Sequence, residues 1–131
     1  MDRLRKEKSF ELTRILAKTI SNAKGSNIRA LDVSKVFSLS DSFIIASGRS
    51  DRHAQGICNN ILARLQEMGI KPLAVEGYDQ AHWILIDLGE VIIHIFYEGV
   101  RDKYNLESLW VSAEALDLDE SLHATNDNKA A

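Results

Sequence analysis

The sequence contains only one cysteine, Cys58, and this scarcity limits the classes of protein it can encode. A single thiol cannot form a disulfide within the chain, so a reducing cytosol is compatible with the composition. Long apolar runs are missing too, because the longest are strand-sized and fall well short of a membrane span. Residues 1–15 lack the apolar core of a secretory signal, and their acidic residues argue against a transit peptide. We therefore expect a cytoplasmic protein.

An excess of positive charge is also absent. The net charge is −3, so bulk electrostatics do not draw the chain onto nucleic acid or an anionic membrane, and any such contact must be local. Hydrophobic residues make up 45% of the sequence and charged residues 27%, which is typical of a globular protein rather than a disordered one. The 131 residues contain no internal repeat and are enough for one hydrophobic core. The sequence therefore predicts a single domain.

Hydrophobic periodicity predicts how helices and strands alternate along the chain. Apolar residues recur at helical spacing over residues 4–24, with Gly25 as the stop, and again from the N-cap Ser50 to Gly69. Strands are expected at residues 28–33, at residues 43–47, which begin with the uninterrupted apolar run Phe-Ile-Ile-Ala, and at residues 73–76. The last two strands and the helix between them predict a right-handed parallel crossover. These elements indicate an α/β fold in which a mixed sheet of about five strands is packed by helices on one face.

Residues 77–110 are the most informative segment, because two apolar runs hinged on residues 88–90 predict a β-hairpin. With a two-residue loop, residues of opposite parity on the two strands share a face. One face is then aliphatic and carries Ile84, Ile86, Leu88, Val91, Ile93 and Ile95. The other carries Trp83, Leu85, Asp87, Ile92, His94 and Phe96, a set too apolar for a solvent face and too polar for a core. We expect this second face to bind a protein partner, with an exposed Trp83 as its anchor.

The polar residues of that face admit more than one interpretation. Asp87 either contacts the partner or accepts hydrogen bonds from amides of the hairpin turn. His94 either makes a recognition contact or packs as a polar residue, and catalysis is disfavoured because no activated serine or cysteine is evident near it. Cys58 lies on the apolar stripe of its helix, where burial raises the pKa of a thiol. We expect no catalytic residue in this chain.

Metal and nucleotide sites are the main alternatives to a protein-binding face. The four histidines do not show zinc spacing, and the carboxylates of Asp87 and Glu90 are too loosely specified to hold a divalent metal. We expect no metal and no cofactor. The turn at residues 47–50 precedes a helix and leaves an anion site open, although Ser50 as N-cap and Gly48 as turn residue explain the same pattern. A metal-dependent nucleotidyltransferase or nucleotide-binding protein is therefore the alternative to a non-enzymatic binder.

Several linked motifs together resemble one known family. They are ALDV at 30–33, SDSFIIASG at 40–48, SDRH at 50–53, VEG at 75–77 followed by Trp83, DLGEVIIH at 87–94, and Arg101 with YNLESLW at 104–110. In this order and spacing they make the chain similar to the Iojap or RsfS ribosomal silencing factors over residues 12–110. The sequence departs from the pattern at residues 96–100, where many relatives have a histidine after the phenylalanine.

The resemblance implies a fold like that of a minimal nucleotidyltransferase, without that activity, and a role in translation. A protein of this kind binds the large ribosomal subunit at its ribosomal protein fourteen (uL-fourteen), blocks joining of the small subunit and represses translation when nutrients are scarce. We expect the mixed hairpin face to make this contact, with peripheral rRNA contact at Arg49, Arg52 or Lys103. Residues 1–110 then form the family domain and residues 111–131 an acidic, flexible tail. Whether the free chain is a monomer, or a homodimer through the same face, stays open.

Overall fold

The computed structural model describes residues 2–35, 39–104 and 114–115, which form three helices and six strands. In chain order they are α1 (Asp2–Asn22), β1 (Ser26–Asp32), β2 (Ser42–Gly48), α2 (Asp51–Glu67), β3 (Ala74–Glu76), β4 (Trp83–Asp87), β5 (Val91–Tyr97), α3 (Glu98–Tyr104) and β6 (Glu114–Ala115). All six strands belong to one sheet, in the order β3-β4-β5-β2-β1-β6. The predicted single-domain α/β fold with a mixed sheet is confirmed.

The sheet is mixed because β5 pairs in parallel with β2 on one side and antiparallel with β4 on the other. β2 and β5 pair in parallel, whereas every other neighbouring pair is antiparallel. β3 runs antiparallel to β4, which runs antiparallel to β5, so β3 is parallel to β2 as the predicted crossover requires. The two strands are not neighbours, because the hairpin of β4 and β5 is inserted between them. All seven residues of β2 are buried, as expected for a strand in the middle of a sheet.

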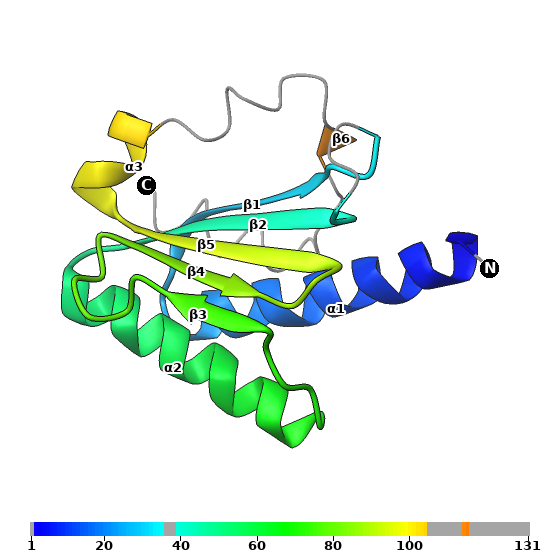
Figure 1. The fold of residues 1–131 in the computed structure, drawn as a ribbon. Coiled ribbons are helices and arrows are strands. Elements are labelled where there is room, and N and C mark those ends of the chain that lie inside the picture. Colours follow the sequence, from blue (N-terminus) through cyan, green and yellow to red (C-terminus); the bar gives the residue numbers. More distant parts are fainter. Residues whose placement is uncertain (1, 36–38, 105–113, 116–131) are drawn as a thin grey trace.

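α1 and α2 lie on the same side of the sheet, below the strands in Figure 1. The main core forms between them and the sheet, with α1 supplying Leu16 and Ile20, α2 supplying Ile57 and Ile61, and β5 supplying Ile93 among others. Burying an aliphatic side chain of this size stabilises a fold by roughly 1.5–3 kcal/mol relative to leaving it exposed. The helical periodicity of both segments follows from this one-sided packing. Neither α1 nor the other helices described here are long and apolar enough to cross a membrane.

α2 begins and ends where the sequence predicts. Ser50 is the N-cap, and its side-chain oxygen accepts a hydrogen bond from the backbone N–H of His53. At the other end Gly69 has a φ of +72°, and Ile70 donates its N–H to the carbonyl of Leu65. This is a Schellman cap, in which the glycine takes the left-handed conformation without steric cost.

α1 also ends in a Schellman cap, but a lysine and not a glycine takes the left-handed position. Gly25 donates its N–H to Ile20 and Lys24 donates to Ser21, but the left-handed residue is Lys24, with a φ of +69°. Gly25 is needed for space instead, because a Cβ there would lie 2.4 Å from Cγ2 of Ile20. The expected stop at Gly25 is therefore correct in place, but its physical reason is close packing and not a positive φ.

The C-terminal predictions fall largely outside the described residues. The spacing of Leu106, Leu109 and Trp110 predicts a short C-terminal helix with these residues on its apolar side. This helix and most of the acidic tail lie outside the described residues. Two residues that the sequence assigned to the tail, Glu114 and Ala115, form β6 and pair with Asp32 and Leu31 of β1. α3, which follows β5 directly, was not predicted.

Candidate protein-docking surface

The hairpin of β4 and β5 has the predicted register. Its turn consists of Gly89 and Glu90 and is closed by a 2.9 Å hydrogen bond from the N–H of Leu88 to the carbonyl of Val91. Trp83 then faces Phe96, Leu85 faces His94, and Asp87 faces Ile92. The face of Ile84, Ile86, Val91, Ile93 and Ile95 packs into the main core, between the sheet and the two helices α1 and α2. The opposite face, which we call the hairpin surface, carries Trp83, Leu85, Asp87, Ile92, His94 and Phe96.

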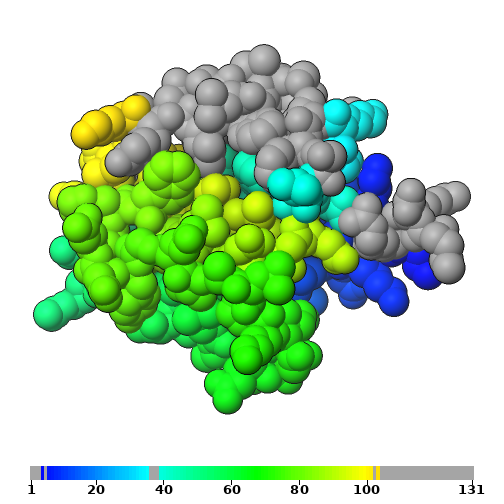
Figure 2. All heavy atoms as spheres, viewed as in Figure 1, coloured from blue at the N-terminus to red at the C-terminus, as the bar shows by residue number. Residues whose placement is uncertain are grey.

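The six residues of the hairpin surface differ in exposure. Trp83, Leu85, Asp87 and Ile92 are half-buried, whereas His94 is 4% exposed and Phe96 is fully buried. The expectation of an exposed Trp83 is therefore wrong, because its ring packs against a second apolar cluster that includes Phe96. Figure 2 shows the green and yellow-green residues of β3, β4 and β5 across one side of the molecule, with α1 visible only at its margin.

Trp83 is held by two neighbours from β5. Its ring stacks on Phe96 with centroids 5.1 Å apart and an angle of 26° between the planes. Its indole Nε1–H donates a 3.1 Å hydrogen bond to Nδ1 of His94. A ring held by both stacking and a hydrogen bond loses little further freedom when a partner covers it. The arrangement produces an ordered aromatic side chain on a sheet face.

The hydrogen bond from Trp83 also assigns the protonation of His94. Because Nδ1 accepts, the neutral imidazole must carry its proton on Nε2. Burial lowers the pKa of His94 from 6.5 to about 4, so the ring is neutral near pH 7. Nε2 is buried and has no hydrogen-bond partner among the described residues. Phe43 packs beside the ring, with centroids 4.9 Å apart. A neutral, buried ring that is hydrogen-bonded to an indole and packed beside a phenyl ring fits the packed polar residue that the sequence offered as one of the roles of His94.

The two carboxylates at the hairpin tip do not converge on a metal site. Asp87 accepts a 2.8 Å hydrogen bond from the N–H of Gly89. It therefore binds an amide of the hairpin turn, which is one of the two roles that the sequence left open for it. Glu90 accepts a 3.1 Å hydrogen bond from Oγ of Ser9 on α1, which also donates to the buried Asp41 at 3.0 Å. Among the described residues, no group of three or more metal-binding side chains could hold an ion.

Four residues of the second apolar cluster were not singled out from the sequence. Leu31 and Val33 from the β1 segment, and Phe43 and Ile45 from β2, are buried with Phe96, while Trp83 and Ile92 pack against them. The signal was present in their odd numbering, which places them on the face opposite Ala30, Ile44 and Ala46. What the sequence could not reveal was that β2 lies next to β5 and so extends the hairpin surface.

The other sequence candidates are placed as follows. Cys58 is buried in α2, and burial raises the pKa of its thiol to about 11, which suits the expected structural role. In the 47–50 turn, Ser50 is the N-cap and Gly48 lies so close to α2 that a Cβ would meet the backbone nitrogen of Ala54 at 2.9 Å. Arg49, Arg52 and Lys103 are exposed.

With this geometry established, comparison with known proteins identifies the family. A family model described as "Ribosomal silencing factor during starvation" (RsfS) matches residues 6–131. The chain belongs to the RsfS family.

The relatives of this RsfS-family chain are bacterial and organellar. It is similar to "Ribosomal silencing factor RsfS" of Bacillus subtilis (strain 168), with 38% identity over 108 residues that cover 82% of the chain and 92% of the relative. A crystal structure from Bacillus halodurans is 35% identical, superposes with a TM-score of 0.74 and covers 82% of this chain and 98% of its own. A mouse protein, "Mitochondrial assembly of ribosomal large subunit protein 1", is 25% identical over 73% of this chain but only 43% of its own length. The predicted resemblance and the α/β fold are both confirmed.

Proposed function

We propose that this RsfS-family protein binds the large ribosomal subunit through ribosomal protein fourteen (uL-fourteen) and thereby blocks joining of the small subunit. The observation that carries the proposal is the hairpin surface, an ordered Trp83 with Leu85 and Ile92 on a sheet face. A central aromatic anchor surrounded by apolar neighbours and a few polar groups is the composition of a protein-binding surface. Membership of a family described as ribosomal silencing factors supports the ribosome as the partner in this proposal.

The six residues divide into contact and support in this proposal. Trp83, Leu85, Asp87 and Ile92 are half-buried and therefore offer area to the partner. His94 and Phe96 lie beneath and hold the indole in place by a hydrogen bond and a stacked ring. Because the anchor is ordered before binding, less conformational entropy is lost when the interface forms.

The mechanism needs no catalysis. A protein seated where the small subunit must dock excludes it by occupancy, so repression follows the fraction of large subunits that carry the factor. The large subunit is favoured as the target because the mouse relative is named for assembly of that subunit. Repression when nutrients are scarce follows the wording of the family description, and the cytoplasmic location expected from the sequence belongs to the same proposal.

Substitution of Trp83 tests the centre of the contact. Trp83→Ala removes the anchor and should weaken binding to purified large subunits by roughly 30-fold or more, the loss typical of a hot-spot residue. Leu85→Ala, which removes area without touching the stacked pair, should weaken binding less. The measurement is co-sedimentation of each variant with large subunits over a range of protein concentrations.

The matched control is Leu4→Ala, because Leu4 is 56% exposed and lies on α1, on the opposite side of the sheet from the hairpin surface. It should bind as the original protein does. Circular dichroism of each variant separates loss of binding from loss of fold. Undiminished co-sedimentation of a folded Trp83→Ala variant would refute the proposed centre, and light scattering over a concentration series would show whether free copies pair through the same face.

A further inference from the structure

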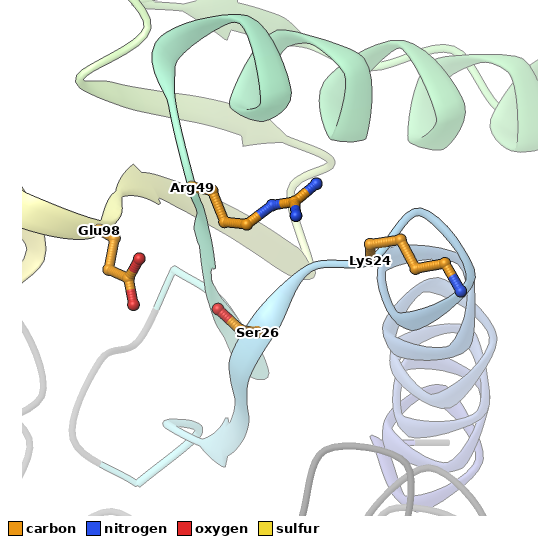
Figure 3. Close-up of a pocket in the computed structure, with 4 residues that line it drawn as sticks. All are labelled: Lys24, Ser26, Arg49 and Glu98. Atoms are coloured by element: carbon orange, nitrogen blue, oxygen red, sulfur yellow. The ribbon is translucent and has the colours of Figure 1, made fainter. Parts of the chain in front are cut away.

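A second candidate site lies at the end of the sheet where β2 and β5 terminate. A cavity of about 550 Å³ is lined there by Lys24, Ser26, Arg49 and Glu98. The four residues come from different segments: Lys24 follows α1, Ser26 begins β1, Arg49 follows β2, and Glu98 begins α3. Figure 3 shows Arg49 extending toward the end of α1, where Lys24 lies, and away from Glu98. The carboxyl ends of parallel strands are the usual place for ligands in α/β folds.

The walls of this cavity are positive in a chain whose net charge is −3. Lys24 and Arg49 contribute two cations and Glu98 one carboxylate, which leaves a local excess of one positive charge. Lys24 and Arg49 are exposed, and neither side chain has a hydrogen bond or ion pair within the part of the chain that is described. The two cations are therefore available to an anion from solution.

The positive charge comes from side chains and not from the start of α2. The N–H of Arg49 is bonded to His53, that of Arg52 to Asp51, and that of His53 to Ser50. The N–H of Ala54 donates to the carbonyl of Ser50. These amides are used within the helix cap, so the attraction for an anion rests on Arg49 and Lys24.

His53 holds the two cation-bearing segments at a fixed spacing. Its Nδ1 accepts a 2.9 Å hydrogen bond from the backbone N–H of Arg49, so its Nε2 carries the proton and donates to the carbonyl of Ala23 at 2.9 Å. Ala23 directly precedes Lys24. The ring therefore ties the turn after β2 to the end of α1, and the cavity is formed before a ligand arrives.

Lys24 occupies a position where glycine is the usual residue. α1 and α2 end in the same Schellman cap, yet α2 places Gly69 at the left-handed position and α1 places Lys24 there. A non-glycine residue is disfavoured in that conformation. The lysine gains a favourable interaction with the helix C-terminus, but any cation in the last turn would supply this. At this position the lysine also lines the cavity.

We propose that this cavity binds one nucleotide of a single-stranded RNA, with a phosphodiester between Lys24 and Arg49 and a sugar hydroxyl at Glu98. The local excess of one positive charge matches the single charge of a phosphodiester, and the volume lies within the range of small-ligand sites. A nucleoside triphosphate fits less well, since its several negative charges would need a metal ion and would meet the carboxylate of Glu98. The proposal goes beyond the protein contact of the hairpin surface and does not depend on it.

Fluorescence anisotropy with a labelled oligouridylate provides the test. Arg49→Ala should weaken RNA binding by roughly tenfold, as expected for loss of a charge-assisted phosphate contact. Lys24→Gly should weaken it similarly while raising the melting temperature, because the left-handed position becomes unstrained. A purely structural lysine would not give this opposite pair of changes. The deoxy version of the oligonucleotide should bind more weakly than the RNA.

Lys71→Ala is the matched control, because it removes one exposed cation beyond the far end of α2 and should leave RNA binding unchanged. Trp83→Ala should also leave it unchanged, which separates failure of this site from failure of the docking surface. The proposal is overturned if the original protein does not bind the oligonucleotide, or if Arg49→Ala and Lys24→Gly bind it as tightly as the original protein does. Calorimetric binding of magnesium ATP that Arg49→Ala abolishes and RNA does not displace would also overturn it.

Discussion

His94 connects the chemistry of the hairpin surface to the stability of the chain. Its Nδ1 accepts a hydrogen bond from the indole N–H of Trp83, while Nε2 is buried without a hydrogen-bond partner in the part of the chain that the structure describes. Leaving a buried donor unpaired costs about 1–3 kcal/mol. Protonating the ring would cost more, because Nδ1 would then carry a hydrogen facing the indole N–H. The residue therefore orders Trp83 only while it is neutral.

This coupling predicts a dependence of stability on pH. The pKa of His94 is lowered by burial from 6.5 to about 4 in the folded chain, so between these values the unfolded chain binds more protons at this residue. The contribution of His94 to folding is fully present above pH 6.5 and is lost as the pH falls toward 4. The full loss is about 3 kcal/mol, which urea unfolding at a series of pH values can measure.

The variant His94→Asn isolates this effect, because an amide oxygen can still accept from Trp83 but does not titrate in this range. It should remove most of the decline in stability between pH 6.5 and 4. His82→Asn, which replaces an exposed histidine next to Trp83, should leave the decline in place. An unchanged pH profile in His94→Asn would contradict the assignment.

At the scale of elements, the start of β4 depends on a close approach by Gly77. This glycine has a φ of +79°, and a Cβ on it would lie 2.1 Å from the carbonyl oxygen of Trp83. Gly77→Ala should therefore destabilise the chain by roughly 2 kcal/mol or more, since strain in the backbone and a steric clash combine. Denaturant unfolding measures the change.

Gly56 offers a control of the opposite sign. It lies inside α2, where an added Cβ meets nothing within 4 Å. Gly56→Ala should stabilise the chain by about 0.5–1 kcal/mol, because alanine loses less conformational freedom in a helix. Equal effects of the two substitutions would show that the approach to Trp83 is not the cause.

The elements also show how far sequence patterns reach. The faces of the hairpin follow from residue parity, and the ends of α2 follow from Ser50 and Gly69, because these signals are local. The place of β5 beside β2 is a long-range pairing that no local pattern encodes. That pairing completes the apolar cluster against which Trp83 packs, since β2 adds Phe43 and Ile45 beside Phe96 of β5. The cavity residues were missed as a group for the same reason, as they meet only when four segments converge.

At the scale of the whole molecule, the two faces of the sheet differ in what they do: one supports the fold and the other is the proposed docking surface. One face is covered by α1 and α2 and holds the main core, whereas the other presents the hairpin surface. Polar contacts at one end of the sheet join distant parts of the chain, since Ser9 of α1 bonds to both Asp41 and Glu90. The hairpin is thereby tied to α1. A surface supported in this way can bind by rigid docking, with little rearrangement of the backbone.

The central claim is that occupation of the large subunit by this protein prevents the small subunit from joining. Purified subunits are mixed with enough protein to saturate the large subunits, and the joined ribosomes are measured by gradient sedimentation. The original protein should reduce the joined fraction in proportion to its occupancy, and the folded Trp83→Ala variant should restore it. Joining that is undiminished while the large subunit is saturated with protein would contradict the account.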